Sequence, residues 1–258
     1  MIIEWTQIAG LSCVFMRMSG CILFNPILGR RNFPMLFQIG MTLMFSFMIM
    51  SYSDVQVAAE TTFLLYAFLL IRELFIGFTI GIVVSIFMYV VIIAGEFIDM
   101  QMALSMSKIY DPQSGISMSV TATNLNLMFM FLFFGLNGHL TLIHLFMHSA
   151  EILPYGTVAF VNQDLSMRIL DIFCQCTILG LKLAMPIAGI LFLLQIGIGV
   201  LMKTVPQVNV FVLSLQMKIM TGLMMLFVIF TPIARYIEEV ITLLFRTLGE
   251  ILMIMGGV

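Results

Sequence analysis

Charged residues are spaced so widely along the chain that long apolar segments separate them. Asp, Glu, Lys and Arg are absent from the segments 32–53, 74–95, 112–150 and 183–202. A helix needs about 20 apolar residues to cross the hydrocarbon core of a bilayer, so each segment is long enough to span a membrane. The pattern predicts six hydrophobic helical units, at 5–25, 34–53, 63–95, 119–147, 170–200 and 213–235, followed by a helical tail at 236–258.

The third of these units is too long for one upright span. At about 1.5 Å per residue, a helix over 63–95 would be about 50 Å long. It therefore tilts strongly, breaks near Arg72 and Glu73, or leaves the bilayer for part of its length. Backbone polar groups inside lipid must be paired, and no segment has the alternating pattern of a membrane barrel. The predicted fold is therefore an all-α polytopic membrane protein with no sheet.

Composition supports this fold class and excludes several others. Hydrophobic residues make up 62% of the chain and charged residues 9%, whereas roughly 25% of the residues of a soluble domain are charged. The net charge of −2 excludes a basic nucleic-acid binder. Motifs for nucleotide binding, zinc-dependent hydrolysis or a nucleophilic serine are absent from the sequence, so we expect neither catalytic activity nor a cofactor.

The loops carry a modest charge asymmetry. Arg30, Arg31, Lys108 and Lys203 follow the first, third and fifth units, which would lie on one side of the membrane. By the positive-inside rule, this favours both termini outside the cytoplasm. The first helix is expected to be retained, because the start of the chain lacks the basic region of a signal peptide.

Charge and small residues occur together in the N-terminal part. Arg17 interrupts the first hydrophobic unit, where it either snorkels to the membrane surface or pairs with a carboxylate such as Glu73. Gly77 and Gly81 follow Glu73 at intervals of four residues, a spacing that lets another helix approach closely. These residues are expected to be buried charge and packing positions.

Two further charges, Asp171 and Lys182, lie on one face of the fifth unit. They either form a proton or ion relay or make buried contacts in an assembly, and we expect the second role. His144, His148 and Glu151 also share a helical face, which suits either a zinc ion or a wetted helix end. We expect the wetted end and no bound metal.

Methionine is unusually frequent, with 25 residues in a chain of 258. Its flexible, polarizable side chain adapts to irregular shapes, so a cluster of methionines can fill a core or close around a changing pore. One cluster lies in the segment 100–118, between two apolar units. The residues of this candidate plug are Met100, Met102, Met106, Lys108 and Met118.

Several motifs in a fixed order resemble the FliR family of type III export-gate proteins, which includes injectisome relatives. The motifs are Arg17-xx-Gly20, Glu73-xxx-Gly77-xxx-Gly81, GEFIDMQ at 95–101, Asn137-Gly138-His139 and PQVNVF at 206–211. The chain departs from the family pattern at Lys203, where arginine is frequent, and at 102–104, which lack a glycine expected near Gln101.

The resemblance implies a non-enzymatic gate subunit in the bacterial inner membrane at the flagellar basal body. Such a subunit would form, with FliP and FliQ, a pore for unfolded flagellar subunits, and would dock FlhB on its cytoplasmic side. It also implies a FliP-like four-helix unit at 1–169 and a FliQ-like hairpin at 170–258. The expected partner-docking loop comprises Lys203, Pro206, Gln207, Asn209 and Phe211.

Three other functions stay open from the sequence. One is the corresponding gate subunit of an injectisome. Another is a secondary transporter of a small solute or ion that uses Asp171 and Lys182 as a relay. The least supported is a membrane enzyme that uses the His144 and His148 pair.

Overall fold

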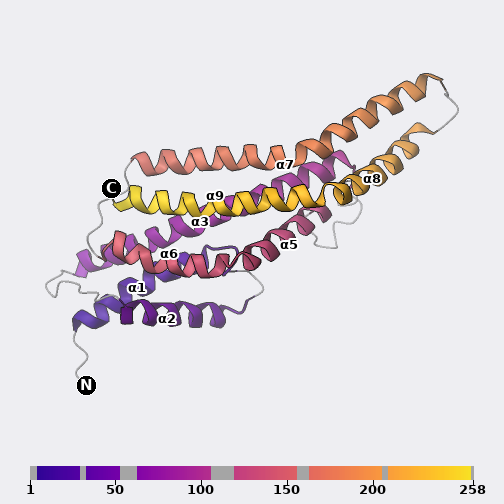
Figure 1. Cartoon of the computed structure of the whole chain (residues 1–258). Coiled ribbons are helices and arrows are strands. Elements are labelled where there is room, and N and C mark those ends of the chain that lie inside the picture. Colours follow the sequence, from indigo (N-terminus) through magenta and orange to yellow (C-terminus); the bar gives the residue numbers. More distant parts are fainter. Residues whose placement is uncertain are drawn as a thin grey trace. The chain divides into compact units, whose positions relative to one another are not determined.

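The computed structural model describes residues 5–29, 33–52, 63–105, 119–155, 163–204 and 209–256. Within these ranges every regular element is a helix (Figure 1). The helices are α1 (Trp5–Leu23), α2 (Met35–Tyr52), α3 (Phe63–Gln101), α5 (Val120–Gly135), α6 (Gly138–Ile152), α7 (Gln163–Thr204), α8 (Val210–Val228) and α9 (Phe230–Gly256). The predicted all-α fold is confirmed.

Four helices in the described part of the chain are long and apolar enough to cross a membrane. They are α2, α3, α8 and the stretch Leu165–Thr204 of α7. The number rises to five if the interrupted pair α5 and α6 counts as one span. The apolar part of α1, Gln7–Leu23, is shorter. Length and composition therefore support the predicted helical membrane protein.

The third predicted unit is one continuous helix. α3 passes through Arg72 and Glu73 without interruption and continues to Gln101, so the alternative of a break at these charges is wrong. Most residues of α3 are apolar, and the helix contains no proline. Glu73 is paired with Arg17 of α1, whereas Nε and Nη2 of Arg72 are buried without a hydrogen-bond partner among the described residues.

The fourth and sixth predicted units have different helix boundaries in the structure. The fourth is divided into α5 and α6 at Asn137, whose backbone is left-handed with φ 57°; asparagine tolerates this conformation better than most residues. The sixth ends at Val228 rather than at 235. Pro232 explains this, because its ring would clash with the carbonyl of Val228 in a continuous helix.

The helices form two compact units. The first comprises 1–86, 137–172 and 242–258, and the second comprises 87–136 and 173–241. In the first unit α1 lies against α2 and the first half of α3, and the buried side chains include Cys13, Val14, Ile22, Ile80 and Phe146. In the second unit they include Val90, Phe129, Phe133, Ala184 and Leu191. The division at residue 169 expected from the resemblance stays a prediction.

The end of α3 has the geometry of a Schellman motif. Leu104 N donates to Asp99 O at 3.0 Å, and Ala103 N donates to Met100 O at 3.2 Å. Ala103 lies between these bonds with φ 62°, in the left-handed region that glycine usually occupies at this position. The glycine that the sequence lacks at 102–104 is therefore replaced by a strained alanine.

Ala103→Gly should stabilise the protein by about 1 kcal/mol, because glycine adopts a positive φ without the Cβ clash. The change should raise the melting temperature of the purified protein by a few degrees. Ala234→Gly, inside α9, is the matched control and should lower it, since glycine weakens a helix interior. A lower melting temperature for both variants would contradict the strain at Ala103.

Candidate functional site

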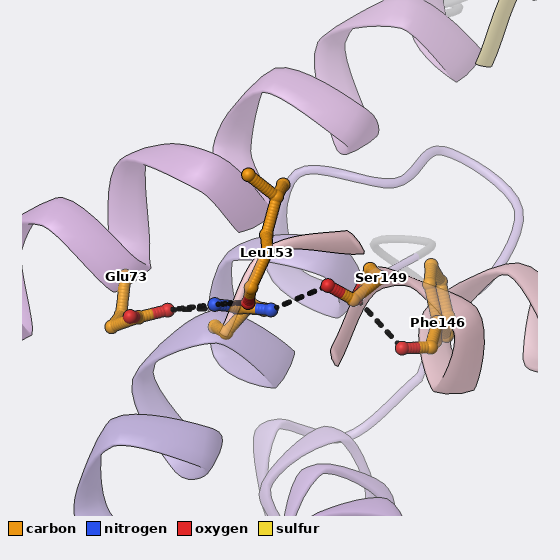
Figure 2. Close-up of polar contacts among 5 residues, drawn as sticks. Glu73, Phe146, Ser149 and Leu153 are labelled. Atoms are coloured by element: carbon orange, nitrogen blue, oxygen red, sulfur yellow. Dashed lines mark hydrogen bonds and ion pairs between the residues drawn. The ribbon is translucent and has the colours of Figure 1, made fainter. Parts of the chain in front are cut away.

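The most complete polar site in the described part of the first unit surrounds Arg17, whose side chain is 0% exposed. Its Nε donates to Glu73 Oε2 at 2.7 Å, and Nη2 lies 2.7 Å from the same oxygen. Nη1 donates to the carbonyl of Ser149 at 3.0 Å and Nη2 to that of Leu153 at 2.9 Å. Glu73, Ser149 and Leu153, which supply these acceptors, are labelled in Figure 2. Arg17 thus pairs with a carboxylate and does not snorkel.

An aromatic ring completes the enclosure of the guanidinium. The Cζ atom of Arg17 lies 4.0 Å from the ring centroid of Tyr155, a cation–π distance. Burial raises the pKa of the Tyr155 hydroxyl to about 12, although the positive charge of Arg17 opposes this rise. The phenol therefore stays neutral, and the charge of Arg17 is balanced by Glu73 alone among these residues.

The site joins three helices at a position where charge is costly. Arg17 belongs to α1, Glu73 to α3, and the carbonyls of Ser149 and Leu153 to the last turn of α6 and its cap. The C-terminus of a helix carries a partial negative charge, so a cation is favoured there. The guanidinium bonds to groups of α3 and α6, whereas the hydroxyl of Tyr155 is buried without a hydrogen-bond partner in the described part of the chain. The bonds of Arg17 hold α1, α3 and α6 in one register.

Glycines let α1 and α3 come close enough for this pairing. A Cβ atom on Gly77 would lie 2.0 Å from the carbonyl oxygen of Arg17, and one on Gly20 would lie 2.5 Å from that of Leu74. Further along the same contact, a Cβ on Gly81 would lie 2.9 Å from Cβ of Phe24. The predicted small-residue stripe is thus a backbone-to-backbone contact between α1 and α3.

The structure places Asp171 and Lys182 differently from these buried groups. Both are exposed, and neither makes an ion pair with another residue of the described part of the chain. The chain itself therefore does not bury Lys182, and burial would require a partner. The described residues also contain no cluster of three potential metal ligands, while Nδ1 of His148 lies 2.7 Å from Oε2 of Glu151 at an exposed position.

The two candidate loops are described only in part. Met102 is fully buried against α8, where a Cβ on Gly222 would lie 2.6 Å from its Sδ, whereas Met100 is exposed. Lys203, Asn209 and Phe211 are exposed at the facing ends of α7 and α8. The other expected loop residues lie outside the described residues; they are Met106, Lys108, Met118, Pro206 and Gln207.

Sequence reasoning did not identify the partners that α6 supplies to Arg17. Two of them are backbone carbonyls, at Ser149 and Leu153, which every residue has and which therefore leave no signature. Tyr155 could have been noted as an aromatic residue directly after an apolar helix, but nothing in its spacing links it to Arg17.

Arg17→Met should destabilise the protein by roughly 3–5 kcal/mol, because it leaves the carboxylate of Glu73 buried without its partner. The double variant Arg17→Met with Glu73→Met removes both charges and keeps side chains of similar length, so it should recover at least half of that loss. Chemical denaturation of the purified protein in detergent would measure both. A double variant no more stable than Arg17→Met alone would mean that the pair is not what stabilises this site.

Comparisons with known proteins agree with the motifs. The sequence matches the model of the family described as bacterial export proteins, family 1, over residues 8–244. It is 28% identical over 247 residues to the flagellar biosynthetic protein FliR of Bacillus subtilis (strain 168), covering 94% of each chain. It is also 28% identical over 238 residues to FliR of Escherichia coli (strain K12), covering 92% of this chain and 90% of the relative.

A relative with a different name is similar at lower identity. The surface presentation of antigens protein SpaR of Shigella flexneri is 24% identical over 221 residues, which covers 84% of each chain. The family model extends over nearly the whole sequence, including the helix that carries Arg17 and the one that carries Glu73. The protein therefore belongs to the bacterial export proteins, family 1.

Proposed function

We propose that this chain is a structural subunit of the flagellar type III export gate in the bacterial inner membrane. It would assemble with FliP-, FliQ- and FlhB-type proteins at the flagellar basal body into a pore for unfolded flagellar subunits. The observation that carries the proposal is the similarity to proteins named FliR along 94% and 92% of this chain. The absence of catalytic activity stays a prediction.

The exposed surfaces of α7 and α8 support a role in an assembly. Both helices have large apolar side chains that no other part of the described chain covers, including Met185, Phe192, Leu193, Met220, Met224 and Phe227. Such faces are stable only against lipid or against other helices. Packing against FliP- and FliQ-type helices would cover these side chains. We also propose that the chain divides into a FliP-like part, 1–169, and a FliQ-like part, 170–258.

Two other functions have less support. The injectisome alternative rests on SpaR, which is less similar to this chain than the flagellar relatives above. A transporter relay would need Asp171 and Lys182 to connect to further polar groups inside the chain, and both are instead exposed without an ion-pair partner in the described part.

Within the gate, the segment 100–118 is proposed to be the plug that seals the closed pore. Its start is anchored, because Met102 is fully buried against α8 at Gly222. Methionines suit a seal that must close around different shapes. Deleting part of the segment should raise leakage of small solutes in cells that express the full gate, and a membrane as tight as wild type would contradict the plug role.

The segment from Lys203 to Phe211 is proposed to dock an FlhB-type partner. Lys203, Asn209 and Phe211 are exposed, and Phe211 offers an apolar anchor at the start of α8. A cysteine at position 211 should crosslink to that partner in cells. Accessibility of this cysteine to reagents from the periplasmic side alone would contradict the docking role.

Lys182 is proposed to pair with a group of a partner subunit rather than to carry protons. Lys182→Met removes the charge and keeps an apolar stem of similar length, so it should reduce the number of assembled gates more than the export per gate. Lys182→Arg, which keeps the charge, is the control and should assemble better. Counting complexes by native gel beside secreted substrate separates the roles, because a relay residue would give normal assembly without export.

Deleting the gene from its bacterium should abolish both motility and secretion of flagellar subunits, and the intact chain should restore them. Tagged chain should also co-purify with FliP- and FliQ-type proteins from the same cells. Normal flagellar secretion after deletion, together with a loss of injectisome secretion, would favour the injectisome alternative. Normal secretion by both routes would contradict a gate function.

A further inference from the structure

The end of α3 and the start of α5 lie in direct backbone contact within the second unit. A Cβ atom on Gly95 would lie 2.2 Å from Cα and 2.3 Å from the backbone nitrogen of Ala122. Asp99 follows Gly95 by four residues and so lies one turn further along the same face of α3. The close approach at Gly95 therefore brings the carboxylate of Asp99 to the first turn of α5.

Asp99 caps α5 from another helix. Its Oδ2 accepts a hydrogen bond from Thr121 N at 3.2 Å, while the hydroxyl of Ser119, the N-cap residue, accepts one from Ala122 N at 3.2 Å. The first N–H groups of a helix have no partner inside that helix and carry partial positive charge, so a carboxylate is favoured there. The Ser119 bond is local to α5, whereas the Asp99 bond joins α5 to α3.

The burial of Asp99 indicates that its role is not simply to stabilise the contact between the two helices. Asp99 is 2% exposed, and its second oxygen, Oδ1, is buried without a hydrogen-bond partner. A buried carboxylate with one unsatisfied oxygen is costly, so an apolar residue would give a more stable contact between α3 and α5. What an apolar residue cannot supply is a directional bond to one backbone N–H.

We propose that Asp99 is a positioning residue that holds the first turn of α5 against the last turn of α3, and so fixes the spacing of the two ends of the plug segment. This rests on the plug role proposed above for 100–118. Met102 adds a second attachment at the same end, since its side chain is fully buried against Gly222 of α8. The seal then depends on where its ends are held as well as on its methionines.

A positioning role differs from a role of the negative charge itself. Asp99→Asn keeps an oxygen that accepts from Thr121 N but removes the charge, whereas Asp99→Ala removes both. Ser119→Ala removes the other cap of α5 without touching the link to α3. Glu96→Gln changes an exposed carboxylate one turn earlier on α3 and serves as the matched control.

The experiment uses gates assembled in cells with their partner proteins and measures leakage of a small solute per assembled complex. Gates that lack residues 106–118 give the reference for an open pore. Asp99→Ala should leak several-fold more than wild type and approach this reference, while Asp99→Asn, Ser119→Ala and Glu96→Gln stay near wild type. In the purified gates, hydrogen exchange at the Thr121 amide should be at least about tenfold faster in Asp99→Ala, because a hydrogen bond to a charged group is lost.

The other results separate the role of the plug from the role of Asp99. If the deletion leaks and Asp99→Ala does not, the plug stands and Asp99 does not position it. If the deletion itself does not leak, both the plug and the role of Asp99 in it are refuted. Should Asp99→Ala fail to assemble, Asp99→Asn decides: near wild-type leakage supports positioning, whereas leakage at the deletion level with Thr121 still protected shows that the charge is what matters.

Discussion

The buried pair of Arg17 and Glu73 is the interaction on which the first unit depends. An arginine cannot lose its charge in a protein, so a fully buried guanidinium without hydrogen-bond acceptors would strongly destabilise the folded state. Here it finds a carboxylate on α3 and two carbonyls at the end of α6, at 2.7 to 3.0 Å. Moving any one of the three helices by a few ångströms would leave a buried charged group without its partner. The pair therefore fixes the register of α1, α3 and α6 together.

The glycines and the charges serve the same contact. Arg17 reaches Glu73 because Gly20 and Gly77 let the backbones of α1 and α3 touch, and the close contact in turn excludes water from the pair. α3 repeats this arrangement at its other end. There Gly95 lets the helix approach α5, and the carboxylate of Asp99 accepts a hydrogen bond from Thr121 N. In both places a glycine of α3 lies four residues from a carboxylate, and that carboxylate accepts a hydrogen bond from another helix.

The sequence allowed the fold class and one half of the main site to be predicted, for physical reasons. Charge-free segments of membrane length leave few architectures open, and a buried Arg17 demands a carboxylate, of which Glu73 was a suitable one. The partners on α6 could not be predicted, because carbonyl oxygens are the same at every position. The division at Asn137 depends on one left-handed residue, and the end of α8 on a proline four residues later, and hydrophobic periodicity reports neither.

Two sets of charges on the chain differ in where their partners lie. Arg17, Glu73 and Asp99 are buried and bonded within the chain, so they hold its own helices together. Asp171 and Lys182 are exposed on α7, which is otherwise rich in exposed apolar side chains. A charge beside such a surface is stable only if water, a lipid headgroup or a partner satisfies it. The chain therefore has a core of its own, held by its buried charges, and an exposed surface on α7 that suits an assembly. The free energy of unfolding of the α7 region would then depend on which lipid or partner covers that surface.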